Sequence, residues 1–371
     1  AIEISPLLAS HDITSQRRPT ALALPIWVLF GGALLLVLAV GLRWRAAAGD
    51  LWLDELVTLD HLRHLDSPLA IIWGRYFDNS HPLNSLYLYL LPDAQSPQVL
   101  RGLSILAGAV TVLFVAMLGR RRGVAGFFIY GTIFALSFPF VHFSSEARGY
   151  GSLMAFWCMA IYLVEPSAKV KPSRVHWLLP LVSVLGLLSH LFFLAALAVL
   201  ALWHLERRLA EGEGVMAAYD RVMADFRSSC WAVALLLTSM LWAWRRFGME
   251  FGGLPSGDIG NLPWVLEFFG ASMARVFGLG DALPHWLLAV LVPCGLISLF
   301  LLHRSLAPER AQAWRAFYVL HLLIVPLLFL KFGHLRYQIF FAAALLFLLA
   351  DVLTTFWQQA RPGHWVAIAL M

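Results

Sequence analysis

Carboxylates interrupt an otherwise apolar part of the chain in the segment LWLDELVTLDHLRHLDS, residues 51–67. The acidic residues of this segment are Asp54, Glu55, Asp60 and Asp66. Asp54 and Glu55 directly follow the apolar LWL, so they would be held close to a bilayer surface and to any lipid-borne substrate. A carboxylate within hydrogen-bond reach of a hydroxyl is an adequate general base for a transfer reaction. The alternative is the solvated face of an interfacial helix, a role that we assign to Asp60 and Asp66.

Two other segments place polar side chains where apolar helices are predicted to begin. SHPLNSLYLYLL (80–91) places His81, followed by proline, at the start of an aromatic helix, and proline suits the first helical turn. The alternative role for His81 is a capping or interfacial histidine. KFGHLRYQIFF (331–341) places Arg336 and Tyr337 at the start of a later span, where both residue types also serve as interfacial anchors.

A further polar group lies in HFSSEARGYGSL (142–153), at the predicted junction of two spans. Glu146 and Arg148 would lie there at membrane depth, where ionisable groups are costly and usually face a cavity or one another. They are therefore candidates for a polar site, and a purely structural ion pair between them is the alternative. His190, in LLSHLFF, is expected at the same level and is interpreted as a helix-end residue.

The composition determines the class of protein that must position these side chains. Of the 371 residues, 60% are hydrophobic and 13% are charged, and the mean hydropathy is +0.75. These values predict a polytopic membrane protein and exclude a soluble globular domain. The apolar runs are continuous instead of alternating, which favours helices over a β-barrel. The net charge of +5 comes from short basic clusters between apolar segments, which indicates membrane topology and not nucleic-acid binding.

Ten apolar segments predict an all-α polytopic fold with about 10–11 transmembrane helices. The predicted spans are residues 21–42, 100–119, 124–143, 150–164, 176–189, 191–205, 229–247, 285–302, 314–332 and 338–356. Residues 1–20 would form a cytoplasmic tail and residues 21–371 a single transmembrane domain. The predicted loops are a first external loop with amphipathic helices at 43–99, a cytoplasmic loop at 206–228 and a second external loop at 248–284. Basic clusters then lie inside, so we expect a plasma (inner) membrane protein with a cytoplasmic N-terminus.

Five segments together, by their order, sidedness and spacing, resemble the GT-C glycosyltransferases. The resemblance is greatest to the protein O-mannosyltransferase-like branch, which includes lipid A aminoarabinose transferases. The matching segments are LWLDE (51–55), SHPLNSLYLYLL (80–91), LRGLSILAGAVTVLFVAMLGRR (100–121), SSEARGY (144–150) and LRYQ (335–338). Family members commonly carry Pro and Tyr where this chain has Leu83 and Asn84, and they often have Gln at the position of Ser145.

The resemblance implies a GT-C-like fold and the transfer of a sugar, with inversion, from a polyprenyl-phosphate donor. The acceptor would be a lipid, a glycan or a protein on the extracytoplasmic face. Asp54 matches the family's catalytic base, Glu55 would orient the acceptor or the sugar, and Glu146 would contact the sugar or hold Arg148. No metal or other cofactor is expected, because external arginines can supply positive charge and the three cysteines lack CxxC spacing. A divalent cation near Asp54 and Glu146 is the alternative.

The leaving polyprenyl phosphate is an anion, and arginines stabilise such groups through directed, charge-assisted hydrogen bonds. The resemblance therefore implies that Arg148 and Arg336 bind the phosphate, with His81 as a third hydrogen-bond donor. Tyr150 and Tyr337 belong to the matching motifs and complete the expected substrate-binding set.

Two other classes of protein stay open. A secondary transporter would also carry ionisable groups in apolar spans, but it would show paired broken helices and charges near mid-membrane. The predicted charges gather at one face instead. A catalytically inactive GT-C-like structural subunit of a membrane complex would keep the fold without the chemistry, since a fold does not confer a function. The changed residues Leu83 and Asn84 keep that alternative in view.

Overall fold

The computed structural model describes residues 25–77, 81–92, 95–165, 172–250, 284–324 and 339–360. Helices dominate these ranges, and the only strands within them are β1 (Tyr76–Phe77) and β2 (Met249–Glu250), which pair in parallel. The predicted all-α class is confirmed. The predicted tail at 1–20 and most of the predicted loop at 248–284 lie outside the described residues.

Five helices within the described ranges are long and apolar enough to cross a membrane. They are α1 (Ile26–Ala46), α6 (Gly102–Arg120), α12 (Val215–Phe247), α14 (His285–Leu306) and α18 (Ile339–Gln359). A helix of about 20 residues spans roughly 30 Å, the thickness of the hydrocarbon core. Shorter helices of the bundle are α7 (Val124–Leu136), α9 (Tyr150–Val164), α10 (Pro172–Ser189) and α11 (Phe193–Ala210). The chain therefore has the architecture of a membrane-embedded helical protein, while the full number of ten spans stays a prediction.

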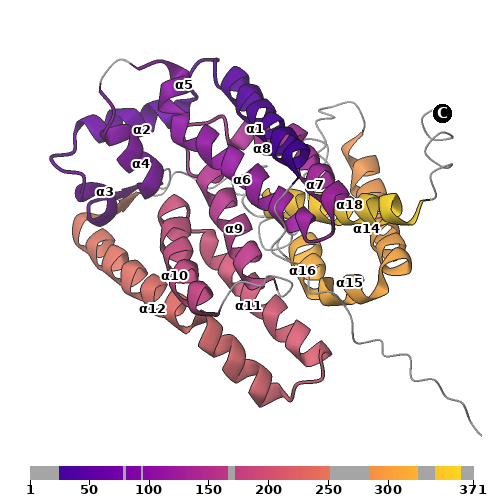
Figure 1. Ribbon diagram of the computed structural model, residues 1–371. Helices are drawn as coiled ribbons and strands as arrows, with labels where there is room; N and C mark the ends of the chain where they lie inside the picture. Colours follow the sequence, from indigo (N-terminus) through magenta and orange to yellow (C-terminus); the bar gives the residue numbers. More distant parts are fainter. Residues whose placement is uncertain are drawn as a thin grey trace, which may run out of the picture.

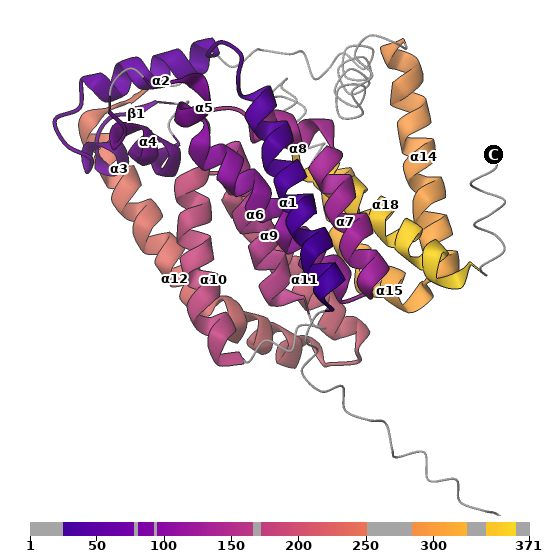
Figure 2. The same cartoon turned by 45° about the horizontal axis from the view of Figure 1, so that its top comes forward.

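The remaining helices are short. They are α2 (Leu53–Arg63), α3 (Ala70–Trp73), α4 (Pro82–Tyr89), α5 (Pro97–Leu100), α8 (Phe138–Phe143), α15 (Pro308–Ala313), α16 (Arg315–Val319) and the π-helical turn η1 (Leu320–Ile324). Figure 1 shows α6, α7 and α9 in the middle of the bundle, with α10 and α12 on one flank and α14, α15 and α18 on the other. Figure 2 shows α2, α3, α4 and α5 grouped at one end of the long helices. This end carries the residues of the candidate site.

The span predicted at 124–143 is divided in the structure. α7 ends at Leu136, Ser137 is extended, and α8 begins with Pro139 in its first turn. Proline has no backbone N–H, so Pro139 cannot donate to the carbonyl of Ala135 and continue α7. The break therefore leaves carbonyl groups at the end of α7 without their helical partners.

Arg43 donates hydrogen bonds to two of these carbonyl groups. Its side chain is fully buried near the end of α1, and its Nη1 donates to the carbonyl oxygens of Ala39 at 3.0 Å and of Ala135 at 3.4 Å. Its Nη2 donates to the carbonyl oxygen of Phe134 at 3.5 Å. These bonds satisfy the two terminal nitrogens of the buried guanidinium, while its Nε has no hydrogen-bond partner among the described residues. Arg43 thus links α1 to the break between α7 and α8.

The loop predicted at 206–228 is mostly helical. α11 continues to Ala210 and α12 already begins at Val215, so only residues 211–214 connect the two helices. Charges of this segment pair across the short connection, as Arg208 of α11 does with Glu213 of the connecting turn at 3.0 Å. Such partly exposed ion pairs stabilise the polar ends of the two helices.

The C-terminal helices are joined to the bundle through Asp351 of α18, which is fully buried. Its carboxylate accepts a hydrogen bond from the Tyr130 hydroxyl of α7 at 2.7 Å and pairs with Arg122 Nε at 2.5 Å. His303 of α14 lies 3.2 Å away and Arg310 of α15 lies 3.3 Å away. A buried carboxylate needs such partners to offset its lost hydration. This cluster lies at the end of α6 and α7 opposite to α2.

Candidate functional site

The candidate site is built from the first turns of α2, α4 and α9 and from the end of α10. Asp54 lies in the first turn of α2, His81 directly precedes α4, and Tyr150 begins α9. These positions are far apart in the sequence, and residues of α2 and α4 contact the short turn that carries Arg148. Figure 1 shows α2 and α4 beside the end of the bundle where α9 begins.

Asp54 and Arg148 form the central ion pair of this group. The Arg148 Nη1 atom lies 2.5 Å from Asp54 Oδ2, and the two side chains are 8% and 32% exposed, respectively. The guanidinium also lies over the Tyr150 ring, with 5.2 Å between Cζ and the ring centroid. The pair therefore places a buried guanidinium directly beside a partly exposed carboxylate.

Glu55 is the neighbour of Asp54, but its surroundings differ. It is fully buried and accepts from Arg101 Nε at 2.9 Å and from Arg101 Nη2 at 2.6 Å. The backbone N–H groups of Trp52 and Ala147 donate to it at 2.7 Å and 2.5 Å. These four bonds occupy the four acceptor positions of a carboxylate. The structure thus makes Glu55 a positioning residue, which differs from the predicted contact with the acceptor or the sugar.

The backbone around Arg148 is fixed from several sides. Ala147 donates its N–H to Glu55, and its carbonyl accepts from Asn84 Nδ2 at 2.6 Å. The carbonyl of Arg148 accepts from the Ser104 hydroxyl at 2.9 Å. Three elements, α2, α4 and α6, therefore hold this turn. These hydrogen bonds fix the backbone of the turn, and the fixed backbone positions the Arg148 side chain.

Three aromatic rings pack beside Arg148. The ring centroid of Tyr150 lies 5.3 Å from that of His81 and 5.0 Å from that of His190, and the two histidines are 5.0 Å apart. His81 Nδ1 lies 3.2 Å from the carbonyl oxygen of Ser189 and must donate to it, so in the neutral ring Nε2 is an acceptor. His81 can therefore give a hydrogen bond to a phosphate only when its ring is protonated.

His190 has the opposite arrangement, which the sequence did not reveal. Its Nδ1 accepts from the backbone N–H of Phe192 at 3.1 Å, so the neutral ring carries its proton on Nε2. His190 is thus a hydrogen-bond donor at neutral pH, whereas the sequence interpretation gave it only a helix-end role. The signal that could have found it is its position directly after a span at the level of Tyr150.

Glu146 is also buried in this turn, and its Oε1 lies 3.3 Å from His142 Nε2. The Arg148 side chain pairs with Asp54, and the roles predicted for Glu146, a contact with the sugar or with Arg148, stay predictions. His142 was not among the predicted site residues. Its position four residues before Glu146, one helical turn away, was the available signal.

Two predicted binding residues cannot be placed in the structure. Arg336 and Tyr337 lie outside the described residues, so their placement stays a prediction. Within the described ranges, no group of three or more His, Cys, Asp or Glu side chains could hold a metal ion. Further out on α2, burial and then the charges of His64 and Arg75 lower the pKa of His61, and Asp60 opposes this shift.

A close backbone approach at Gly149 provides a test of this geometry. A Cβ atom built on Gly149 would collide with the carbonyl oxygen of Ser189 and lie 2.9 Å from His81 Nδ1. We expect Gly149→Ala to lower the free energy of unfolding by about 1–3 kcal/mol, the usual cost of overpacking. The measurement is denaturant unfolding in detergent micelles. Gly49→Ala, where a Cβ meets nothing within 4 Å, is the control, and an equal effect of both substitutions would refute the close approach.

The fold and the site together define the class of this protein as an all-α membrane-embedded protein with a polar cluster at one end of its helices. Comparison with protein families, with curated proteins and with solved structures gives no match to the chain. Its function is therefore argued from the residues of the site.

Proposed function

We propose that the chain is a membrane-embedded inverting glycosyltransferase that moves a sugar from a polyprenyl-phosphate donor to an acceptor on the extracytoplasmic face. The observation that carries the proposal is the pairing of Asp54, a partly exposed carboxylate, with the buried guanidinium of Arg148. The reaction needs a base for the acceptor hydroxyl and a cation for the leaving phosphate. The two side chains supply one of each.

The surface of α2 supports a substrate held in a lipid. Leu53, Leu56 and Val57 are exposed on this helix, next to Asp54 in its first turn. Exposed apolar side chains on a short helix can contact acyl chains at the boundary between headgroups and hydrocarbon. The phosphate of a polyprenyl carrier lies at this same boundary, because its tail is apolar and its phosphate is charged.

In the proposed reaction the acceptor hydroxyl oxygen bonds to the anomeric carbon while the bond from that carbon to the phosphate oxygen breaks. The electron pair of the broken bond leaves with the polyprenyl phosphate, and an Oδ atom of Asp54 takes the hydroxyl proton. Arg148 donates hydrogen bonds to the phosphate. Because Arg148 binds Asp54 in the absence of substrate, an incoming phosphate competes for the guanidinium and frees the carboxylate to accept a proton.

Other residues of the site are proposed to bind the sugar donor. His190 can donate from Nε2 as a neutral ring, and Tyr150 places its ring beneath the Arg148 guanidinium. Arg336 and Tyr337 are proposed to complete the phosphate site on the grounds of their sequence motif. Glu146 is proposed to contact the sugar from the same turn as Arg148.

Substitution of Arg148 tests the proposal. Purified protein is offered a panel of polyprenyl-phosphate sugars, and the release of polyprenyl phosphate is measured. We expect Arg148→Ala to reduce kcat/KM by about 10²-fold, in line with the loss of a charge-assisted hydrogen bond to a developing anion. Arg148→Lys should restore only part of this, because an ammonium lacks the planar fork of the guanidinium.

Absence of activity in the wild-type protein would contradict the proposal. If the wild-type protein releases no polyprenyl phosphate from any sugar donor offered, the proposed activity is refuted. A catalytically inactive subunit of a membrane complex then becomes the better account, since the Glu55–Arg101 pair stabilises the same fold with or without catalysis.

A further inference from the structure

A cavity of about 170 Å³ lies at the end of the bundle opposite to the candidate site. α6 begins beside Arg101 at the candidate site and runs for 19 residues, or about 28 Å, before Arg121 follows it. α9 likewise begins at Tyr150 and ends just before Glu165. Arg121 and Glu165 both line the cavity, so it is separated from Asp54 and Arg148 by the length of these helices.

Arginines dominate the wall of this cavity. The arginines and tryptophans that line it are Arg121, Arg122, Arg207, Arg310, Trp203 and Trp314. They come from the turn after α6, from α11, from α15 and from the start of α16, so the cavity lies between helices and not on one of them. We call it the arginine cavity. Its volume is below that of typical drug-sized sites and suits a single small anionic group.

Carboxylates offset only part of this charge. Glu165 lines the cavity and pairs with Arg121, and Asp351 pairs with both Arg122 and Arg310 from behind the wall. Glu211 is 4.0 Å from Arg207.

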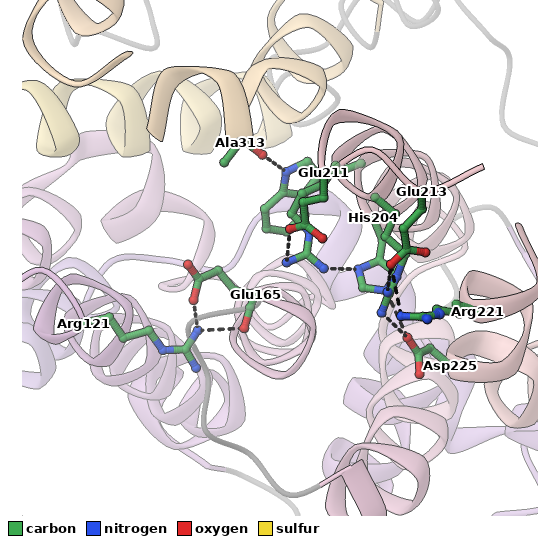
Figure 3. A network of polar contacts seen from close by, with 11 residues as sticks. Arg121, Glu165, His204, Glu211, Glu213, Arg221, Asp225 and Ala313 are labelled. Carbon is green, nitrogen blue, oxygen red and sulfur yellow. Dashed lines mark hydrogen bonds and ion pairs between the residues drawn. The ribbon is translucent and has the colours of Figure 1, made fainter. Parts of the chain in front are cut away.

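Four arginines thus share three acidic partners, which leaves a net positive charge in a partly enclosed space. Figure 3 shows the Arg121–Glu165 pair on one side and His204 and Glu211 on the other. A positive, enclosed wall of guanidinium groups favours an anion with several acceptor oxygens, and phosphate fits this description.

The surroundings of the cavity favour a phosphate that belongs to a lipid. Leu202 and Leu209 are exposed on other faces of α11, the helix that supplies Arg207, so this helix also presents apolar surface near the cavity. Basic pockets between membrane helices bind anionic headgroups. We propose that the arginine cavity binds the phosphate group of an anionic phospholipid, at the membrane face opposite to the candidate site.

The test measures thermal unfolding of the purified full chain in detergent micelles. Three compounds are titrated separately: dihexanoyl phosphatidylglycerol, dihexanoyl phosphatidylcholine and inorganic phosphate. We expect phosphatidylglycerol to raise the unfolding temperature saturably, because ligand that binds the folded state stabilises it. Phosphatidylcholine, whose headgroup has no net charge, should have little effect. A response to inorganic phosphate that equals the response to phosphatidylglycerol would overturn the assignment to a lipid.

Arg207→Gln and Arg310→Gln should each weaken phosphatidylglycerol binding about tenfold, the effect of losing one hydrogen bond to a charged group. Arg221→Gln is the matched control, since Arg221 lies at the same end of the bundle, is 63% exposed and does not line the cavity. Equal weakening by all three substitutions would refute the site and leave only general charge attraction. The wild-type titrations also test the proposal without the variants. An equal rise in unfolding temperature with phosphatidylglycerol and phosphatidylcholine would overturn it.

Discussion

Asp54→Asn is expected to reduce sugar transfer by about 10²-fold or more, the usual scale for a positioned general base. Asparagine keeps the size of the side chain and can still accept a hydrogen bond from Arg148 Nη1, which lies 2.5 Å from the Asp54 carboxylate. It cannot take a proton from the acceptor hydroxyl. The decrease should therefore fall on kcat, while the KM for the sugar donor changes less. Initial rates of polyprenyl phosphate release at several donor concentrations measure both quantities.

The control for this substitution lies on the same helix. Asp60 is exposed on α2, and Asp60→Asn removes one negative charge from the same helix as Asp54→Asn. We expect Asp60→Asn to leave turnover close to that of the wild-type protein. Asp66→Asn, just beyond the helix, should behave in the same way. If Asp54→Asn turns over like these controls, Asp54 is not the base.

Glu55→Gln is expected to destabilise the protein by about 3–5 kcal/mol, the cost of removing one partner from a buried ion pair. Arg101 is only 2% exposed and would lose its carboxylate, although it keeps the carbonyl oxygens of Ala47, Gly49 and Asp50. The amide NH₂ of glutamine would also face donors, because all four bonds to Glu55 come from N–H groups. The free energy of unfolding in detergent micelles measures this effect, and loss of the Arg148 geometry should lower activity as well.

Glu206→Gln is the control for the buried pair. Glu206 pairs with Arg315 at 2.5 Å, but the Arg315 side chain is 58% exposed. An exposed pair contributes little to stability, so we expect a change of less than about 1 kcal/mol. Comparable losses for Glu55→Gln and Glu206→Gln would show that the Glu55–Arg101 pair does not hold the site together.

The sequence located several helices well because strong boundaries flank them. The span predicted at 150–164 coincides with α9, which lies between the polar SSEARG and a glutamate followed by proline. The division of the span at 124–143 was missed because hydropathy continues across Ser137, while Pro139 interrupts the backbone hydrogen bonds. Apolar content sets where a span can lie, and local backbone chemistry sets where a helix ends.

The roles of adjacent acidic residues were harder to predict. Asp54 and Glu55 are neighbours in the sequence and look equivalent, but helical geometry turns them in different directions. Glu55 meets Arg101, which is 46 residues away, and Asp54 meets Arg148, which is 94 residues away. Partners at such separations depend on tertiary packing. Spacing along the chain therefore could not show that Glu55 is buried in a positioning role while Asp54 stays partly exposed.

The most direct test of the proposed transfer is the anomeric configuration of the product. Purified wild-type protein is incubated with a polyprenyl-phosphate sugar of known configuration and an acceptor, and NMR of the product measures the coupling at the anomeric carbon. Direct attack by a hydroxyl that Asp54 deprotonates, with phosphate leaving from the opposite face, predicts a single product of inverted configuration. A product that retains the configuration of the sugar donor would contradict this account, as would the absence of product with every sugar donor tested.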